Sequence, residues 1–274
     1  MRYLQIVAVI FLVFSLLFAG WANNRYYSSL NTDYPTISNS LELLEISVND
    51  PPEMLLEGLS ARDATDGDLT GQIMVASVSH FLEPGTVNIK YVVFDSHNNS
   101  ATLTRKVHYV DYTSPVFSLE KAPVYTVGSA FDLLDYIKVI DCIDGDISNN
   151  IRVISNTVNT FSEGDFPIVL EVSNSCGDTA QITIRVTYRN TENTANIKLH
   201  GHIVYVSQGD TFDPMEQVSS VKAQNGVTLS QQSIEVQGSL NTKKPGCYQL
   251  VYSYNDGKHS GQTPLTVVVT ERQA

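Results

Sequence analysis

The sequence is poor in basic residues, and this shortage sets the first limits on its function. Its 274 residues include 17 Lys and Arg against 29 Asp and Glu, giving a formal net charge of −12 at pH 7. An acidic surface repels phosphate backbones, so nucleic-acid binding is not expected. The charge also argues against adsorption to anionic lipid through a basic patch. It is compatible with cation binding, although most acidic surfaces only keep a protein soluble.

The sequence also lacks the short motifs that carry common enzyme chemistry. It has no Gly-x-Ser-x-Gly element, no glycine loop for phosphate, no His-Glu-x-x-His and no Cys-x-x-Cys. Ser, His and Asp all occur, but nothing in the sequence places them together. Because repeated units occupy most of the chain, we expect a protein that is not an enzyme.

Long apolar runs are absent except at the N-terminus, where residues 3–22 are interrupted only by Gln5 and Ser15. The run is long enough to span a bilayer, and Arg2 precedes it. Small residues at Gly20 and Ala22 also fit a signal peptide cleaved after Ala22. We therefore expect either a single-pass membrane protein whose C-terminal part is extracytoplasmic, or a secreted one. Residues 23–40 are polar and are predicted to be a spacer.

Two similar units follow this spacer. The Asp66–Asp68 element returns at Asp144–Asp146, 78 positions later. Tyr91 and Leu170 are 79 positions apart. One inserted residue over some forty positions indicates a duplication.

A third unit keeps only the second half of the pattern. Tyr252 and Asp256 lie 161 positions after Tyr91 and Asp95. The Asp-Gly-Asp element is lost, and Asn225-Gly226-Val227 stands in roughly its place.

Apolar residues alternate with polar ones inside each unit. In Thr86–Phe94, the residues Val87, Ile89, Tyr91 and Val93 fall on one face, which predicts a strand buried on one side. Turn signals separate such strands at intervals typical of sandwiches. The sequence predicts an all-β protein of three small tandem immunoglobulin-like β-sandwiches after one N-terminal hydrophobic helix. The predicted domains are residues 41–111, 112–189 and a divergent 195–272, and residues 1–22 form the anchor or signal.

At these residues the chain resembles a family of bacterial immunoglobulin-like domains, named after a pesticidal crystal protein or grouped with hyalin-like repeats. The family pattern has an Asp-x-x-Asp-Gly-Asp-Leu-Thr element, a Pro-Gly-Thr-Tyr-x-Val-x-Tyr strand and an Asp-x-x-Gly-Asn turn. The second unit departs from it at Asn174 and Asp178, and the third matches only in its second half. The resemblance implies tandem modules of a surface protein, but the fold does not name a ligand. In the first unit the match rests on Asp63, Asp66, Gly67, Asp68, Gly85, Tyr91, Asp95 and Asn99.

Four carboxylates of the first unit are candidate metal ligands. Asp63, Asp66, Asp68 and Asp95 could bring hard oxygen atoms together for calcium, although their spacing is not that of an EF-hand. The alternative is that they only form turns by accepting hydrogen bonds from their own backbone. In the second unit Asn174 replaces the fourth carboxylate, which should weaken a site there. No other cofactor is expected.

Three cysteines occur, two of them in the second unit. Cys142 and Cys176 have no cysteine counterparts in the other units, which suggests a disulfide formed in an oxidising compartment. Cys247 has no evident partner and is expected to be a small buried residue or an intermolecular thiol.

The sequence favours a non-catalytic extracellular or cell-surface module that acts as a structural spacer or in adhesion and protein interaction. The alternative is a carbohydrate-binding accessory protein in envelope polysaccharide handling. The expected partner is an envelope or extracellular protein or glycan, with the membrane contacted through residues 3–22. The ligand itself is not readable from the sequence.

Overall fold

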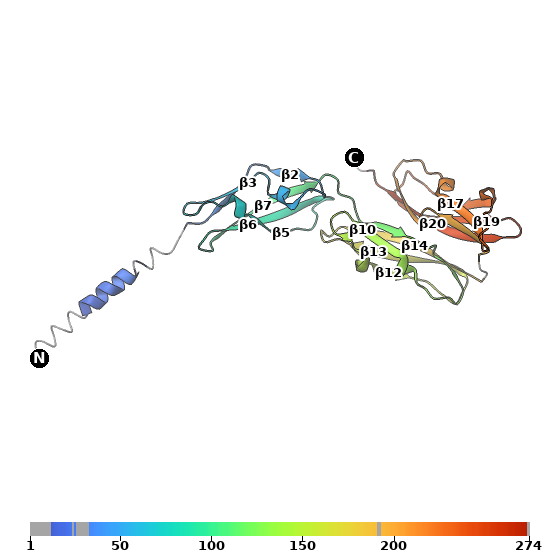
Figure 1. The fold of residues 1–274 in the computed structure, drawn as a ribbon, viewed down its shortest axis with the longest axis horizontal. Helices are drawn as coiled ribbons and strands as arrows, with labels where there is room; N and C mark the ends of the chain where they lie inside the picture. Colours follow the sequence, from blue (N-terminus) through green and yellow to red (C-terminus); the bar gives the residue numbers. More distant parts are fainter. Residues whose placement is uncertain (1–11, 24, 26–32, 191–192, 273–274) are drawn as a thin grey trace, which may run out of the picture. The chain divides into compact units, whose positions relative to one another are not determined.

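The structure is a computed structural model that describes residues 12–23, 25, 33–190 and 193–272. Strands dominate it, and the predicted all-β class is confirmed. The chain divides into two compact structural units, of which the first is Met1–Val110 and the second is Asp111–Ala274. The three sequence repeats correspond to domains 1, 2 and 3. The first unit holds one β-sandwich and the second holds two (Figure 1).

Domain 1 is a seven-stranded sandwich of two sheets. One sheet has the strand order β1-β3-β4 and the other has the order β2-β7-β6-β5. Strand β2 runs parallel to β7, while the other pairs are antiparallel. The strands are β1 Thr36–Asn39, β2 Leu43–Ile46, β3 Leu59–Asp63, β4 Gly67–Asp68, β5 Met74–Val78, β6 Thr86–Phe94 and β7 Ser100–Tyr109.

Domain 2 repeats this topology strand for strand, as the duplication in the sequence predicts. Its sheets have the orders β11-β10-β8 and β12-β13-β14-β9, and β9 again runs parallel to the last strand. The strands are β8 Val116–Leu119, β9 Val124–Thr126, β10 Ile137–Asp141, β11 Gly145–Asp146, β12 Arg152–Asn156, β13 Gly164–Ser173 and β14 Thr179–Arg189.

Domain 3 has the same plan with one strand fewer among its described residues. Its sheets have the orders β15-β17 and β16-β20-β19-β18. The short strand that the Asp-Gly-Asp element forms in the other domains is replaced by a single bridge between Lys222 and Thr228. The strands are β15 Ala195–Leu199, β16 Ile203–Ser207, β17 Val218–Ala223, β18 Ile234–Gln237, β19 Gly246–Asn255 and β20 Ser260–Thr270.

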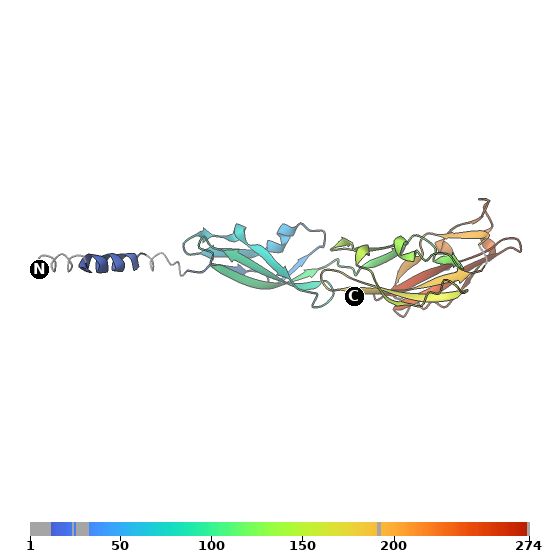
Figure 2. The ribbon, with the colours of Figure 1, turned by 90° about the horizontal axis from the view of Figure 1, so that it is seen from below.

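Alternating side chains explain why the long central strands form. In β6 the four apolar residues of the alternating face, Val87 to Val93, are fully buried. A strand directs every second side chain to the same face, so this face covers the core of the sandwich. The turned view in Figure 2 shows the strands of each domain arranged in two layers around such a core.

Buried polar side chains hold a short 3-10 helix against the domain 1 sandwich. This helix is η1, Pro52–Leu56. Tyr91 donates its hydroxyl to the carbonyl of Leu55 at 2.7 Å. Arg105, 2% exposed, donates to the carbonyls of Leu55 and Glu57 at 2.7 and 2.6 Å. In domain 3, Tyr252 stands at the position of Tyr91 and donates to the carbonyl of Pro214, the first residue of the 3-10 helix η5, Pro214–Gln217.

Domains 2 and 3 share an interface within the second unit. Ile203 of β16 belongs to the core cluster of domain 2, and Tyr205 packs against that cluster. The Tyr205 hydroxyl accepts a hydrogen bond from the backbone N–H of Phe117 at 2.9 Å. Gln249 donates its amide to the carbonyl of Thr183 at 2.8 Å. The two sandwiches are therefore joined by apolar packing as well as by the chain.

The N-terminal part of the chain is helical over residues 12–23. Within the ranges that the structure describes, no helix combines the length and the apolar character needed to cross a membrane. The first part of the predicted span, residues 3–11, lies outside those ranges.

Candidate functional site

Two loops meet at one end of domain 1 and carry the predicted metal ligands. The acidic loop, residues 63–68, runs from the last residue of β3 through β4, and the Asp95 loop, residues 95–99, joins β6 to β7. Asp63 begins the acidic loop and accepts the backbone N–H groups of Thr65 and Asp66 on Oδ1 at 2.8 and 2.9 Å. Gly67 follows with φ of +79°, a conformation that glycine adopts without the steric cost of a side chain. These contacts fix the direction of the Asp66 side chain.

The Asp95 loop is organised by its first residue. Asp95 Oδ1 accepts the backbone N–H groups of His97 and Asn99, both at 2.8 Å. Its Oδ2 accepts the side-chain amide of Asn99 at 2.8 Å. Burial raises the pKa of Asp95, but the hydrogen bonds from Asn99 and His97 outweigh it and hold that pKa below its ordinary value. The carboxyl group is therefore ionised at neutral pH.

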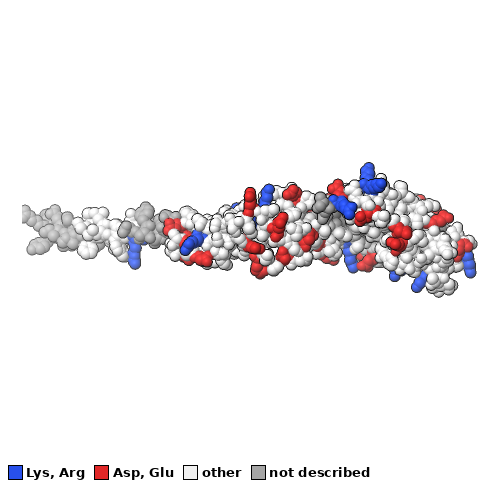
Figure 3. All heavy atoms as spheres, turned by 90° about the horizontal axis from the view of Figure 1, so that it is seen from above, with Lys and Arg blue, Asp and Glu red and all other residues white. Residues whose placement is uncertain are grey.

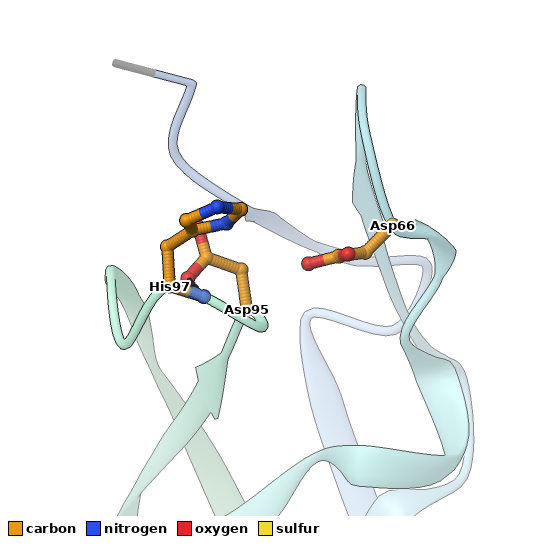
Figure 4. Close-up of side chains that lie close together, drawn as sticks. All are labelled: Asp66, Asp95 and His97. Carbon is orange, nitrogen blue, oxygen red and sulfur yellow. Dashed lines mark hydrogen bonds between the residues drawn. The ribbon is translucent and has the colours of Figure 1, made fainter. Parts of the chain in front are cut away.

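Asp66 links the two loops. Its Oδ2 accepts the backbone N–H of Ser96 at 2.7 Å, and its Oδ1 accepts the Ser96 hydroxyl at 2.9 Å. Figure 4 shows Asp66 reaching from the acidic loop toward Asp95 and His97 on the facing loop. One possible ligand atom from each of these three residues lies within 4.8 Å of the others. The arrangement has the size of a metal-binding group.

The structure groups only part of the predicted ligand set. Asp66 and Asp95 come together, and His97, which the sequence analysis did not include, joins them. Asp68 is engaged elsewhere, because its Oδ1 accepts the N–H of Thr70 at 2.9 Å, and hydrogen bonding by Thr70 lowers its pKa. Asp63 is 3% exposed, and its Oδ2 has no hydrogen-bond partner in the part of the chain that the structure describes. Calcium binding stays a prediction.

Domain 2 has the same frame, meaning an acidic loop and a facing turn between the last two strands, but different side chains lie between these loops. Asp141 Oδ1 accepts the N–H groups of Ile143 and Asp144 at 2.9 Å, as Asp63 does in domain 1. The side-chain amide of Asn174 donates to Asp141 Oδ2 at 3.1 Å and to the Tyr112 hydroxyl at 2.9 Å.

Tyr112 completes this interior, since its hydroxyl donates to the Asp178 carboxylate at 2.6 Å. Burial raises the pKa of Tyr112 above its ordinary value, as does the neighbouring Asp178 carboxylate. Protein groups therefore satisfy both oxygen atoms of Asp141.

Domain 3 has kept only the second loop of this frame. Asp256 stands at the position of Asp95 and accepts the N–H groups of Lys258 and His259. Backbone and side-chain hydrogen bonds from His259 hold the pKa of Asp256 well below its usual range. Ala223 ends β17 where Asp63 ends β3, so the first of the acidic residues is missing.

The predicted Cys142–Cys176 disulfide is wrong, because both cysteines are free in the structure, as is Cys247. The two residues do lie on loops that touch, since Ser175 donates its N–H to Asp144 at 2.6 Å. The Cys142 thiol instead donates to the carbonyl of Thr113 at 3.1 Å. Burial raises the pKa of the Cys176 thiol, which lowers the fraction of reactive thiolate.

The Ser96 hydroxyl lies near a histidine and an aspartate, but the three groups are not arranged as in a catalytic triad. Its hydroxyl donates to Asp66 and lies 3.1 Å from His97 Nδ1. In a nucleophilic triad the histidine stands between serine and carboxylate, so that it can remove the serine proton. Here the hydroxyl lies between the other two groups and donates its hydrogen bond to the carboxylate. The contact therefore does not activate Ser96.

A polar groove of about 550 Å³ lies within the second unit, along the boundary of domains 2 and 3. Arg185 and Arg189 of domain 2 and Tyr248 and Gln249 of domain 3 help to line it. Arg189 also donates to Asp165 at 3.1 Å. The groove presents hydrogen-bond donors and one aromatic ring to solvent.

In Figure 3, acidic and basic side chains are interspersed on the face shown, without a continuous basic surface.

Comparison with known proteins gives matches to bacterial and phage sequences. A family model described as a bacterial surface protein, Ig-like domain, matches residues 197–268. The pesticidal crystal protein Cry22Aa of Bacillus thuringiensis is 26% identical over 223 residues, which are 77% of this chain and 30% of that protein. An uncharacterized 81.3 kDa protein of Acholeplasma phage L2 is 24% identical over 140 residues, 48% of this chain and 19% of that protein. The chain thus spans less than a third of these relatives.

Solved structures give weaker likenesses. The M60 catalytic domain with the CBM51-1 and CBM51-2 domains of Clostridium perfringens ZmpB matches 89% of this chain and 31% of its own, with 14% identity and a TM-score of 0.26. Drosophila N-cadherin EC1-3 matches 85% of this chain and 99% of its own, with 11% identity and a TM-score of 0.29. At these TM-scores neither likeness bears on function.

The family match falls on domain 3, whose motifs are the least complete, while the match to the crystal protein extends over most of the chain. Together they confirm the resemblance to bacterial immunoglobulin-like domains that the Asp-Gly-Asp and Pro-Gly motifs imply. In residues 197–268 the chain is similar to the bacterial surface protein Ig-like domain, the family whose model matches there.

Proposed function

We propose that this chain is a non-catalytic module of the cell surface that acts as a structural spacer and as a platform for protein interaction. The observation that carries the proposal is the apolar packing between domains 2 and 3, in which Ile203 of one domain enters the core of the other. Such packing restricts bending between the two sandwiches, as a spacer requires. The Ser96 contact, which cannot activate a nucleophile, is consistent with a module without catalysis.

Surface location is tested on intact bacteria that express the full chain. An impermeant amine-reactive label should modify the lysines of domains 2 and 3 without lysis, and fractionation with N-terminal sequencing shows whether residues 3–22 remain attached. Retention in the membrane fraction with Met1 intact supports a single-pass anchor. A chain starting after Ala22 in the medium supports a secreted module. Protection of the lysines from label until lysis would contradict a surface location.

The spacer role is tested by comparing the full chain with an Ile203→Asp variant in small-angle scattering. The wild-type data should fit domains 2 and 3 as one body, and the variant should need a distribution of arrangements. Tyr136→Ala, an exposed residue of domain 2, serves as the control and should behave like the wild type. Wild-type data that already need a distribution of arrangements would refute the spacer role.

Carbohydrate binding is the second candidate function, and the polar groove of the second unit favours it. Sugar sites combine an aromatic face with several hydrogen-bond donors and acceptors. Tyr248 and the two arginines supply such groups. Binding of the full chain to an array of envelope glycans should decrease in a Tyr248→Ala variant and persist in Tyr136→Ala. An array without bound glycans, or equal binding by both variants, would refute this candidate.

A further inference from the structure

Domain 1 contains a buried carboxylate oxygen, Oδ2 of Asp63, without a hydrogen-bond partner among the described residues. Asp63 as a whole is 3% exposed. Burying a charged oxygen without a partner is costly, so native proteins neutralise it with a proton, a cation or a donor. A buried carboxylate with nothing to pair it indicates a missing partner.

The repeat shows where this oxygen points. Asp63 and Asp141 end equivalent strands, and the Oδ1 atom of each accepts the same two backbone N–H groups. Since these contacts fix the carboxylate plane, Oδ2 points the same way in both domains. In domain 2 that direction leads to the Asn174 amide, 3.1 Å away.

Asp95 stands where domain 2 has Asn174, on the same turn between the last two strands. The backbone N–H of Asp95 bonds the carbonyl of Asn99, and that of Asn174 bonds the carbonyl of Asp178, both at 3.0 Å. A carboxylate accepts hydrogen bonds but does not donate them when ionised. The same direction in domain 1 leads from Asp63 Oδ2 to Asp95, which lies with Asp66 and His97. A cation bound there would bridge the two carboxylates.

A second difference is the aromatic side chain that fills this end of domain 2. In domain 2 the hydroxyl of Tyr112, which is 4% exposed, occupies the space beside Asn174. Domain 2 thus fills this space with an amide and a phenol, whereas domain 1 presents carboxylates and an imidazole.

We propose that domain 1 binds a divalent cation between Asp63, Asp66, Asp95 and His97, and that domain 2 is the same frame closed by Asn174 and Tyr112. Three carboxylates offset the charge of the ion and leave the site weakly anionic. Carboxylate oxygens suit calcium, and the imidazole nitrogen adds a ligand that zinc prefers. This inference does not depend on the proposed surface role.

Isothermal titration of the full chain tests the proposal. After treatment with chelator and buffer exchange, the protein is titrated separately with calcium chloride and zinc chloride. We expect one site per chain for at least one of the two ions. An Asp95→Asn variant should weaken that binding by about 100-fold or more, because it replaces a ligand with the amide that closes domain 2.

Asp68→Asn is the matched control. It makes the same change of charge in the facing acidic loop, but Asp68 is bonded to Thr70 outside the cluster, so the affinity of this variant should match that of the wild type. His97→Ala, a change at an exposed side chain, should weaken zinc binding more than calcium binding and serves if Asp95→Asn does not fold. Absence of binding for both ions overturns the proposal. Equal losses in the Asp95 and Asp68 variants also overturn it.

Discussion

Replacing Asn174 with aspartate in domain 2 should destabilise that domain by recreating the conflict that domain 1 contains. The change removes the amide that donates to Asp141 and to Tyr112. It also places a second carboxylate against Asp141, which is 2% exposed. Tyr112 still occupies the space that a cation would need, so no ion can relieve the repulsion.

The magnitude follows from the two hydrogen bonds. A buried oxygen left without its donor costs about 1–3 kcal/mol, and a second lost bond adds about 1 kcal/mol. The free energy of unfolding of domain 2 should therefore fall by about 2–4 kcal/mol at pH 7.5. Small domains are stable by only about 5–15 kcal/mol, so the loss is large enough to measure.

The pH dependence identifies the cause. The introduced carboxyl group is buried beside a like charge, so its pKa in the folded state is raised above the unfolded value of about 3.9. A carboxyl with a raised folded pKa destabilises fully above that pKa, and the effect fades as pH falls and the group becomes protonated. The loss should therefore shrink between pH 7.5 and pH 4.5.

Urea unfolding of the full chain, followed by hydrogen exchange of peptides from β13 and β14, measures the stability of domain 2 separately. Asn174→Ala is the control, because it removes the same amide without adding charge. Its loss should be smaller than that of Asn174→Asp at pH 7.5 and should not shrink at pH 4.5. A loss for Asn174→Asp below about 0.5 kcal/mol, or equal losses for both variants at both pH values, would refute this reasoning.

Three further outcomes are expected. Arg105→Ala should lower the stability of domain 1 by about 3 kcal/mol in urea unfolding, since it removes two hydrogen bonds from a charged donor to the carbonyls of Leu55 and Glu57; a loss no larger than that of Lys106→Ala would contradict this. Burial lowers the pKa of His202 below its ordinary value of 6.5, so the stability present above pH 6.5 should be lost as the pH falls below 6.5, and a His202→Gln variant should show a flatter profile in the same assay. Iodoacetamide should label Cys142 and Cys247 in native protein well before Cys176, and a disulfide-linked peptide found in its place would contradict the structure.

The strands of the sandwiches could be predicted from the sequence because their signal is local. The alternation Val87, Ile89, Tyr91 and Val93 requires one buried face, whatever the rest of the chain does. The packing of domain 3 on domain 2 has no such signal. In the sequence, Ile203 and Tyr205 are typical of any strand. Only the structure of the second unit shows that they pack against the core of domain 2.

Part of the candidate site could be predicted from the repeated sequence pattern. The repeat places Asp63, Asp66 and Asp95 on two loops at one end of a sandwich. Asp68 is two residues from Asp66, but Gly67 turns the chain between them, so the two carboxylates take different partners.

His97 could have been found from the repeat, since it stands where domain 2 has Cys176 on a loop already assigned to the site. The predicted disulfide failed because the sequence shows which loops meet but not where each thiol points, and Cys142 bonds a backbone carbonyl.

The most direct test of the account is hydrogen exchange of the full chain, resolved by mass spectrometry, with chelator and then with saturating calcium or zinc. A bound cation should slow exchange in the acidic loop and the Asp95 loop of domain 1. The equivalent segments of domain 2, residues 141–146 and 174–178, should exchange at the same rate in both conditions. Unchanged exchange in domain 1, or equal slowing in both domains, would contradict a frame that binds a cation in one copy and closes itself in the other.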